Sequence, residues 1–168
     1  MDVAARELLI GQYESGPELL QAAVARVPAA ALTWRPGPGL WSVHEVVCHC
    51  ADSEANAAMR LRYLVAETEP VIIGYDQDAW ARELDYHAQS LEDALATVFL
   101  VRRTTGAILR RMRAEAWRCH GTHTERGAYS VEDWMRTYAV HLETHARQVE
   151  RNLAAWEARA DRPRAPRQ

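Results

Sequence analysis

The sequence predicts an all-α protein built as an antiparallel four-helix bundle, and three observations lead to this prediction. Alanine, the strongest helix former, supplies 29 of the 168 residues, against 13 valines and 4 isoleucines. Apolar residues recur at helical spacing in four long segments. The connecting segments are too short for further domains, and each amphipathic helix needs facing partners. We therefore expect one bundle domain over residues 1–160 and a disordered Arg- and Pro-rich tail over residues 161–168.

The first helical segment covers residues 1–27, where leucines, valines and a tyrosine follow an approximate 3.6-residue period. Gly16 and Pro17 interrupt the pattern. Proline is tolerated in the first turn of a helix, so we predict either two short helices or one kinked helix. Pro28 and the Pro- and Gly-rich run 34–39 then predict a loop, because both residue types disfavour continued helix.

The second helix has the clearest start signal in the chain. Ser42 and Glu45 form the S-x-x-E pattern of a capping box, in which each side chain accepts a hydrogen bond from a backbone N–H at the helix start. Trp41 before the cap and Val46 in the next turn would form the accompanying hydrophobic staple. We expect this helix to run over about residues 43–67.

The second half of the chain continues the helical pattern. After a connector at residues 71–75, a capped short helix is expected over about 76–85. The third long helix is predicted over about 90–112, starting at a serine followed by acidic residues. Residues 117–129 hold two glycines and several polar residues that favour loops, so an irregular segment is expected there. A second S-x-x-acid pattern opens the last helix, predicted over 130–158.

Charge and composition exclude several classes of function. The formal net charge is −3, and the two signs are interspersed, whereas a nucleic-acid binder normally carries a basic face. The first ten residues are too charged for a signal peptide, and no apolar run reaches 18 residues. Cys48, Cys50 and Cys119 are an odd number of cysteines, which favours reduced thiols. We therefore expect a cytoplasmic protein that binds neither nucleic acid nor membranes.

His141 and His145 are candidate metal ligands on the last helix. Their i, i+4 spacing projects both imidazoles from one helix face, at a separation that one ion can bridge. They share that face with Trp134, Tyr138 and Gln148, whereas the charged residues mostly occupy other faces. Two solvated or hydrogen-bonded histidines are the alternative interpretation.

A metal site with an open position needs a third protein ligand, which a bundle takes from a facing helix. His49 is the candidate, because it lies two turns into the second helix on a stripe with Glu45 and Ser53. Cys48 and Cys50 flank His49, but residues two apart on a helix point about 200° apart. These two cysteines are therefore expected to fill the core rather than to bind the same ion.

Cys119, His120 and His123 form a rival C-H-x-x-H pattern in the segment expected to be irregular. Such a cluster could hold zinc. It lacks the second pair of ligands that structural zinc motifs usually show, so it is the weaker candidate.

Several runs of the sequence combine into a longer pattern. They are LTWRP at 32–36, WSVHEVVCH at 41–49, ADSE at 51–54, YDQDAW at 75–80, and HLETH at 141–145 followed by Gln148. Together they resemble the signature of the DinB-like (YfiT-like) superfamily of metalloenzymes, which is unrelated to the DNA polymerase that shares its name. The resemblance spans about residues 5–156. One departure is Cys50, which stands where the family usually has leucine.

The resemblance implies a four-helix bundle that holds one divalent metal ion. One histidine on the second helix and an H-x-x-x-H pair on the last helix hold the ion in that family, and they match His49, His141 and His145 here. Zinc is the first expectation, and nickel, iron or manganese are alternatives. Family members with known activity use low-molecular-weight thiols in transferase or isomerase reactions, and the family commonly forms homodimers.

The leading functional prediction is a divalent-metal-dependent enzyme, a thiol S-transferase that acts on a small electrophile. Its partners would be a small thiol and its substrate. A metal-dependent hydrolase would use the same ion with water, and a non-catalytic metal-binding stress-response module would bind metal without turnover. Glu45 is the candidate general base, although its capping role is the simpler interpretation. Tyr138 could donate a hydrogen bond to a substrate or simply pack.

Overall fold

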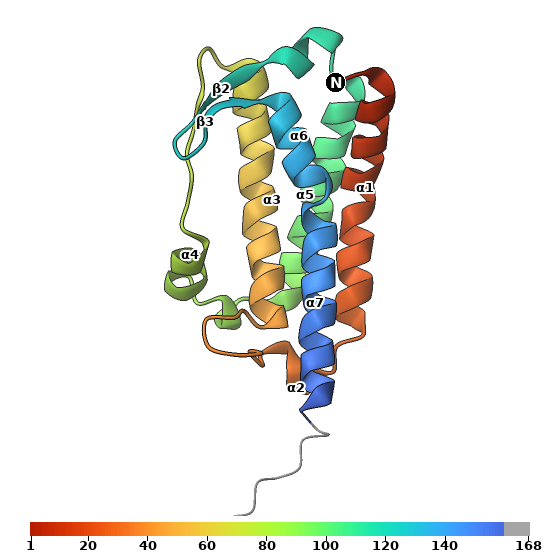
Figure 1. Cartoon of the computed structure of the whole chain (residues 1–168), viewed down its shortest axis with the longest axis vertical. Helices are drawn as coiled ribbons and strands as arrows, with labels where there is room; N and C mark the ends of the chain where they lie inside the picture. The colour runs from red at the N-terminus through yellow and green to blue at the C-terminus, as the bar shows by residue number, and fades with distance from the viewer. Residues whose placement is uncertain (160–168) are drawn as a thin grey trace, which may run out of the picture.

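Four long helices form a bundle in the computed structural model, which describes residues 1–159 (Figure 1). They are α1 (Val3–Ala25), α3 (Val43–Ala66), α5 (Leu91–Arg111) and α7 (His141–Ala158). Each contacts two others, so that the order around the bundle is α1, α5, α3, α7. The predicted four-helix bundle is confirmed. The predicted tail at 161–168 lies outside the described residues.

The helices differ in direction. In Figure 1, α1 and α7 run downward and α3 and α5 run upward. The antiparallel contacts are therefore α1 with α5 and α3 with α7, whereas α1 with α7 and α3 with α5 are parallel. The bundle is thus not antiparallel throughout as predicted, because the long connection from α3 to α5 returns the chain to the end where α3 begins. The facing, antiparallel pair α3 and α7 carries the three histidines that the sequence singles out.

Shorter elements cover the ends and one side of the bundle. The helical ones are α2 (Ala29–Leu32), α4 (Gln77–Glu83), α6 (Val131–Ala139) and the 3₁₀ turns η1 (Tyr86–Ala88) and η2 (Ala114–Arg118). The strands are β1 (Val71–Ile72), β2 (His120–His123) and β3 (Gly127–Ser130). No helix among residues 1–159 combines the length and the hydropathy that a membrane span requires.

Two apolar clusters fill the bundle, one in each half. The first includes Leu20, Val46 and Val149, and the second includes Ile10 and Leu61. Between them lies a layer of buried polar side chains that consists of Glu54, Arg102 and Thr105. The candidate metal centre described below adjoins this layer.

Helix α1 runs through Gly16 and Pro17 without a break, so the expected division into two short helices is wrong. Proline has no N–H, so the carbonyl of Tyr13 loses its helical donor. The guanidinium of Arg102 replaces that donor, with Nη1 donating to the Tyr13 carbonyl over 2.7 Å. Gly16 lets Leu142 of α7 approach closely, because a Cβ at position 16 would lie 3.0 Å from the Leu142 Cβ.

The last predicted helix is divided at Val140 into α6 and α7. The capping box at its start is present, because the side chains of Ser130 and Asp133 each accept a hydrogen bond from the other's backbone N–H. At the break, Arg102 Nη2 donates to the carbonyl of Tyr138 over 2.9 Å. A donor from α5 thus replaces a hydrogen bond of the helix, which periodicity along one segment cannot reveal.

The segment 117–129 is more ordered than predicted. It contains part of η2 and the antiparallel hairpin of β2 and β3, and β2 also pairs in parallel with β1. Two strand residues of the connector 71–75 thereby complete a small sheet. Gly121 packs against Pro70 so closely that a Cβ would lie 2.3 Å from the Pro70 carbonyl oxygen. The irregular-loop prediction is wrong here because pairing with a distant segment stabilises strands that lack strong apolar alternation.

Ser42 begins α3 as predicted, and the complete capping box is present. The Ser42 hydroxyl accepts from the Glu45 N–H at 3.2 Å and also lies 2.8 Å from Nε2 of His87. We expect Ser42→Ala to lower the free energy of unfolding by about 0.5–2 kcal/mol, measured by chemical denaturation. Ser90→Ala is the matched control, because Ser90 caps α5 from an exposed position. A loss at Ser42 smaller than that at Ser90 would contradict this assignment.

Candidate metal centre

The structure brings His49 of α3 together with His141 and His145 of α7. One ring nitrogen from each lies within 4.8 Å of the other two. The ring centroids are 5.7 Å apart for His49 and His141, 4.9 Å for His49 and His145, and 4.6 Å for the α7 pair. The i, i+4 spacing explains the α7 pair, and the antiparallel packing of α3 against α7 supplies the third ring.

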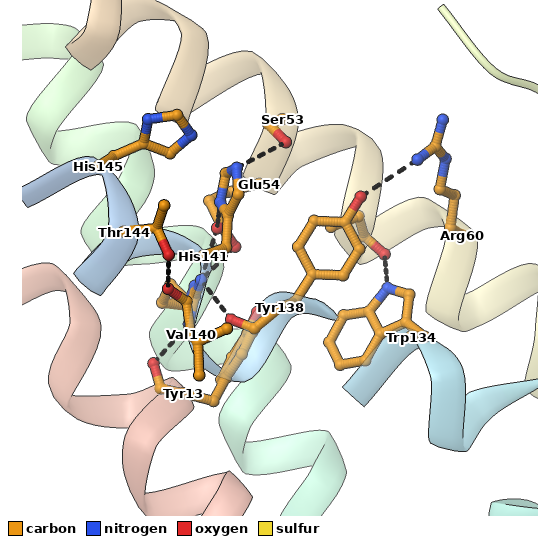
Figure 2. Close-up of polar contacts among 12 residues, drawn as sticks. Tyr13, Ser53, Glu54, Arg60, Trp134, Tyr138, Val140, His141, Thr144 and His145 are labelled. Atoms are coloured by element: carbon orange, nitrogen blue, oxygen red, sulfur yellow. Dashed lines mark hydrogen bonds and ion pairs between the residues drawn. The ribbon is translucent and has the colours of Figure 1, made fainter. Parts of the chain in front are cut away.

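Hydrogen bonds orient the two α7 rings. Nδ1 of His141 donates to Oε1 of Glu54 over 2.8 Å, and Nδ1 of His145 donates to Oε1 of Gln148 over 2.9 Å. With the proton on Nδ1, each ring in its neutral form keeps its lone pair on Nε2. Such a bond from the other ring nitrogen is the usual support of a metal-ligating histidine. Figure 2 shows His141 between Glu54 and Ser53, with His145 beside it.

His49 provides the test of whether the site suits a metal ion. Its Nδ1 is buried and has no hydrogen-bond partner, although buried polar atoms normally have one. Three imidazoles are a donor set that suits zinc and other borderline divalent ions. The residues therefore fit a metal ion, and the assignment of these three histidines as its ligands stays a prediction that the experiments below test.

Burial keeps two of the candidate ligands, His49 and His145, neutral. It lowers the pKa of His49 to about 2, with further lowering by His145 and His141. Burial and the neighbouring His141 lower the pKa of His145 to about 4. Both rings are therefore deprotonated at neutral pH, which is the state that can donate a lone pair to a metal.

Glu54 and Arg102 form the ion pair behind His141. Both side chains are fully buried, and Arg102 Nε and Nη2 each donate to a different Glu54 oxygen over 2.6 Å. Burial alone would raise the pKa of Glu54, but Arg102 and the hydrogen bond from His141 outweigh burial and hold that pKa below its usual value. The carboxylate is thus charged when it orients His141.

The structure also places the two candidate catalytic residues. Glu45 is nearly buried and accepts from Arg35 and from the Ser42 N–H, so its oxygens serve the cap and an ion pair. Tyr138 lies beside the metal centre, with its ring 5.6 Å from that of His141. Its hydroxyl accepts from Arg60 over 3.1 Å and has its own proton to donate. A catalytic role for either residue stays a prediction.

The cysteines and the rival cluster lie elsewhere. Cys48 and Cys50 are fully buried among apolar residues, as predicted. On β2, His120 is exposed and His123 is buried, so the two rings point to opposite faces of the strand. Within residues 1–159, the three helix-borne histidines are the one group of His, Cys, Asp or Glu side chains that could converge on an ion.

Sequence reasoning missed the supporting groups Glu54, Arg102 and Arg60. A signal for Arg102 was available: it lies at helical spacing with Val98, Thr105 and Leu109 on the buried face of α5, where a charged residue needs a partner. No local pattern identifies Glu54 as that partner, because 48 residues separate the two.

The sequence matches the DinB superfamily over residues 12–149. A protein of Oceanobacillus iheyensis named "Putative metal-dependent hydrolase" is 30% identical over 136 residues, which are 81% of this chain and 78% of that protein. YfiT of Bacillus subtilis, named in the same way, is 26% identical over 133 residues, 79% and 75% of the two chains.

The solved structure of YfiT from Bacillus subtilis has the same fold. Its TM-score is 0.86 at 23% identity, and the match covers 94% of this chain and 90% of that one. That structure is described as "a probable metal-dependent hydrolase with an unusual four-helix bundle topology". This chain and that protein therefore share a four-helix bundle in which two pairs of neighbouring helices are parallel.

Proposed function

The chain belongs to the DinB superfamily, and from that premise we propose that it is a metal-dependent enzyme whose ion is held by His49, His141 and His145. One observation carries the proposal: three imidazoles from two facing helices offer nitrogens within 4.8 Å of one another. The relatives named as metal-dependent hydrolases support the same class. Zinc is the proposed ion, with nickel, iron or manganese as alternatives, and elemental analysis of untagged protein identifies it.

When bound, the ion supplies a +2 charge with an open coordination position, which lowers the pKa of a thiol or a water molecule. The chain's own residues prepare the site for that chemistry. Glu54 and Gln148 hold the α7 rings in one tautomer. Trp41 packs against His49 with ring centroids 4.8 Å apart and covers one side of that ring. Tyr138 can donate its hydroxyl proton to a polar atom of the substrate.

A thiol S-transferase is the finer proposal. The sequence resemblance described above supports it, because family members with known activity use small thiols. A neutral donor set also leaves the full positive charge available to an anionic thiolate. A hydrolase is the second candidate, supported by the names of the relatives. Both candidates act on a small electrophilic substrate, and they differ in the nucleophile.

Removing the metal tests whether it is catalytic. We expect chelation to abolish turnover while leaving the helical circular dichroism and a cooperative thermal melt, because a bundle of this size has sufficient apolar core without a metal. Readdition of zinc should restore activity. If the chain unfolds on chelation, the ion is structural, since its binding energy is then part of the folding energy.

A panel of nucleophiles separates the two finer candidates. Cobalt-substituted protein is titrated with small thiols, and a change in its visible spectrum is expected for the transferase. Turnover of esters or amides with no response to any thiol would replace the transferase with the hydrolase. Tight metal binding with no reaction in either panel would favour a non-catalytic binding module.

A further inference from the structure

Arg60 of α3 is a buried cation that lacks an acidic partner. Its exposed fraction is 8%, and no carboxylate within residues 1–159 forms an ion pair with it. The other buried arginine, Arg102, has the carboxylate of Glu54. A buried charge is costly unless it is paired, so the unpaired state of Arg60 calls for an explanation.

The groups around Arg60 leave hydrogen-bonding capacity unused. Nη1 donates to the Tyr138 hydroxyl over 3.1 Å and Nη2 donates to the carbonyl of Ile73, but the buried Nε has no partner. The buried hydroxyl of Tyr75 also has none, and the Arg60 guanidinium carbon lies 5.6 Å from the Tyr75 ring centroid. We call Arg60, Tyr75 and Tyr138 the Arg60 cluster.

The Arg60 cluster adjoins the candidate metal centre. Ser53 Oγ lies 3.5 Å from Nε2 of His141, and the ring of Tyr138 lies 5.6 Å from that of His141. Figure 2 shows Tyr138 between His141 and Arg60. A small molecule at the metal centre could therefore reach the cluster with a second functional group.

Tyr75 connects the cluster to solvent. It lines an open groove of about 730 Å³ between α3 and the segment 73–80, and Trp80 stacks on it with ring centroids 4.3 Å apart. The groove has a largely apolar wall, to which Met59 contributes, and its charged side chains are Asp52 and Asp76. The groove therefore gives a compact organic molecule access to Tyr75, and the positive charge comes from Arg60, which lies against the Tyr75 ring.

We propose that the Arg60 cluster binds a carboxylate of the substrate, so that the enzyme selects small organic acids whose reacting atom lies at the metal. A carboxylate supplies the missing negative charge and accepts hydrogen bonds from a guanidinium and from phenol hydroxyls. Arg60 and Tyr75 thereby become specificity-determining residues. The choice of substrate rests on the proposed function, whereas carboxylate binding by the cluster does not.

Isothermal titration calorimetry of the metal-free full-length protein tests the binding step, with phenylacetate and its neutral analogue phenylacetamide as probes. Without metal, a carboxylate cannot gain affinity by coordination. We expect phenylacetate to bind and phenylacetamide to bind at least about tenfold more weakly. Arg60→Gln should weaken phenylacetate about 10- to 100-fold, because a hydrogen-bonded charge pair is lost. Arg103→Gln is the matched control, since Arg103 is exposed on α5 and the change in net charge is the same.

Tyr75→Phe provides a second variant. It removes a hydroxyl that has no partner in the structure, so it should leave the thermal melting temperature unchanged or raised. We expect it to weaken phenylacetate several-fold, which a purely structural role would not do. This variant decides the matter if Arg60→Gln fails to fold.

Several results would overturn the inference. These are no phenylacetate binding at millimolar concentration, equal binding of the amide, unchanged affinity in both variants, or Arg60-dependent binding of inorganic phosphate in place of phenylacetate. Loss of carboxylate binding with normal turnover of neutral substrates would contradict carboxylate binding by the Arg60 cluster and leave the proposed function intact. Carboxylate binding without any metal-dependent turnover refutes the proposed function alone.

Discussion

Replacing His145 with alanine is expected to reduce the bound metal from about one ion per chain to none after purification and dialysis. Two imidazoles then remain, fewer than the three protein ligands of a zinc site with an open position. Elemental analysis of untagged protein measures the ratio. The fold should persist, because among residues 1–159 the His145 side chain hydrogen-bonds only to Gln148 on the same helix.

His123→Ala is the control for this prediction. His123 is also buried, but it lies on β2, where Nδ1 accepts from the backbone N–H of Glu125 over 3.1 Å. We expect this variant to keep its full metal content. Retention of metal by His145→Ala, or loss of metal by His123→Ala in a folded protein, would contradict the assignment of the ligands.

Arg102→Met is expected to lower the free energy of unfolding by about 3–5 kcal/mol, because it leaves the buried carboxylate of Glu54 without its cation. It also removes the donors to the carbonyls of Tyr13 and Tyr138, where Pro17 and the break at Val140 interrupt regular helical bonding. Chemical denaturation measures the loss. Metal affinity should fall about 10- to 100-fold as well, since Glu54 orients His141.

Arg110→Met is the matched control on the same helix. Arg110 forms ion pairs with Glu7 and Glu14, but its side chain is 41% exposed, and water screens such pairs. We expect almost no change in the denaturation midpoint and no change in metal content. If the two variants are equally stable, the buried pair does not have the structural role assigned to it.

The sequence by itself determined the features that depend on neighbouring residues. The S-x-x-acid patterns at Ser42 and Ser130 located two helix starts, because a capping box closes within four residues. The spacing of His141 and His145 determined that their rings share a helix face. The four-helix bundle followed from four amphipathic segments joined by connectors too short for further domains.

The tertiary structure decided the features that depend on distant partners. Helix α1 continues through Pro17 and the last helix breaks at Val140, and Arg102 of α5 satisfies a backbone carbonyl at each place. The sheet required pairing of β1 with β2, about fifty residues later in the chain. Apolar periodicity and propensity describe one segment at a time, so they cannot report these contacts.

The candidate metal centre shows the same division. Its position on one face of the second helix and the family resemblance predicted His49 as a ligand. Only the packing of α3 against α7 brought it to the other two histidines. No local pattern predicts the roles of Glu54 and Arg60. Glu54 orients His141, and the buried Arg60 lacks an acidic partner. The physical reason is that the cost or benefit of a buried charge depends on which groups surround it in space, and the folded arrangement of the helices determines those neighbours.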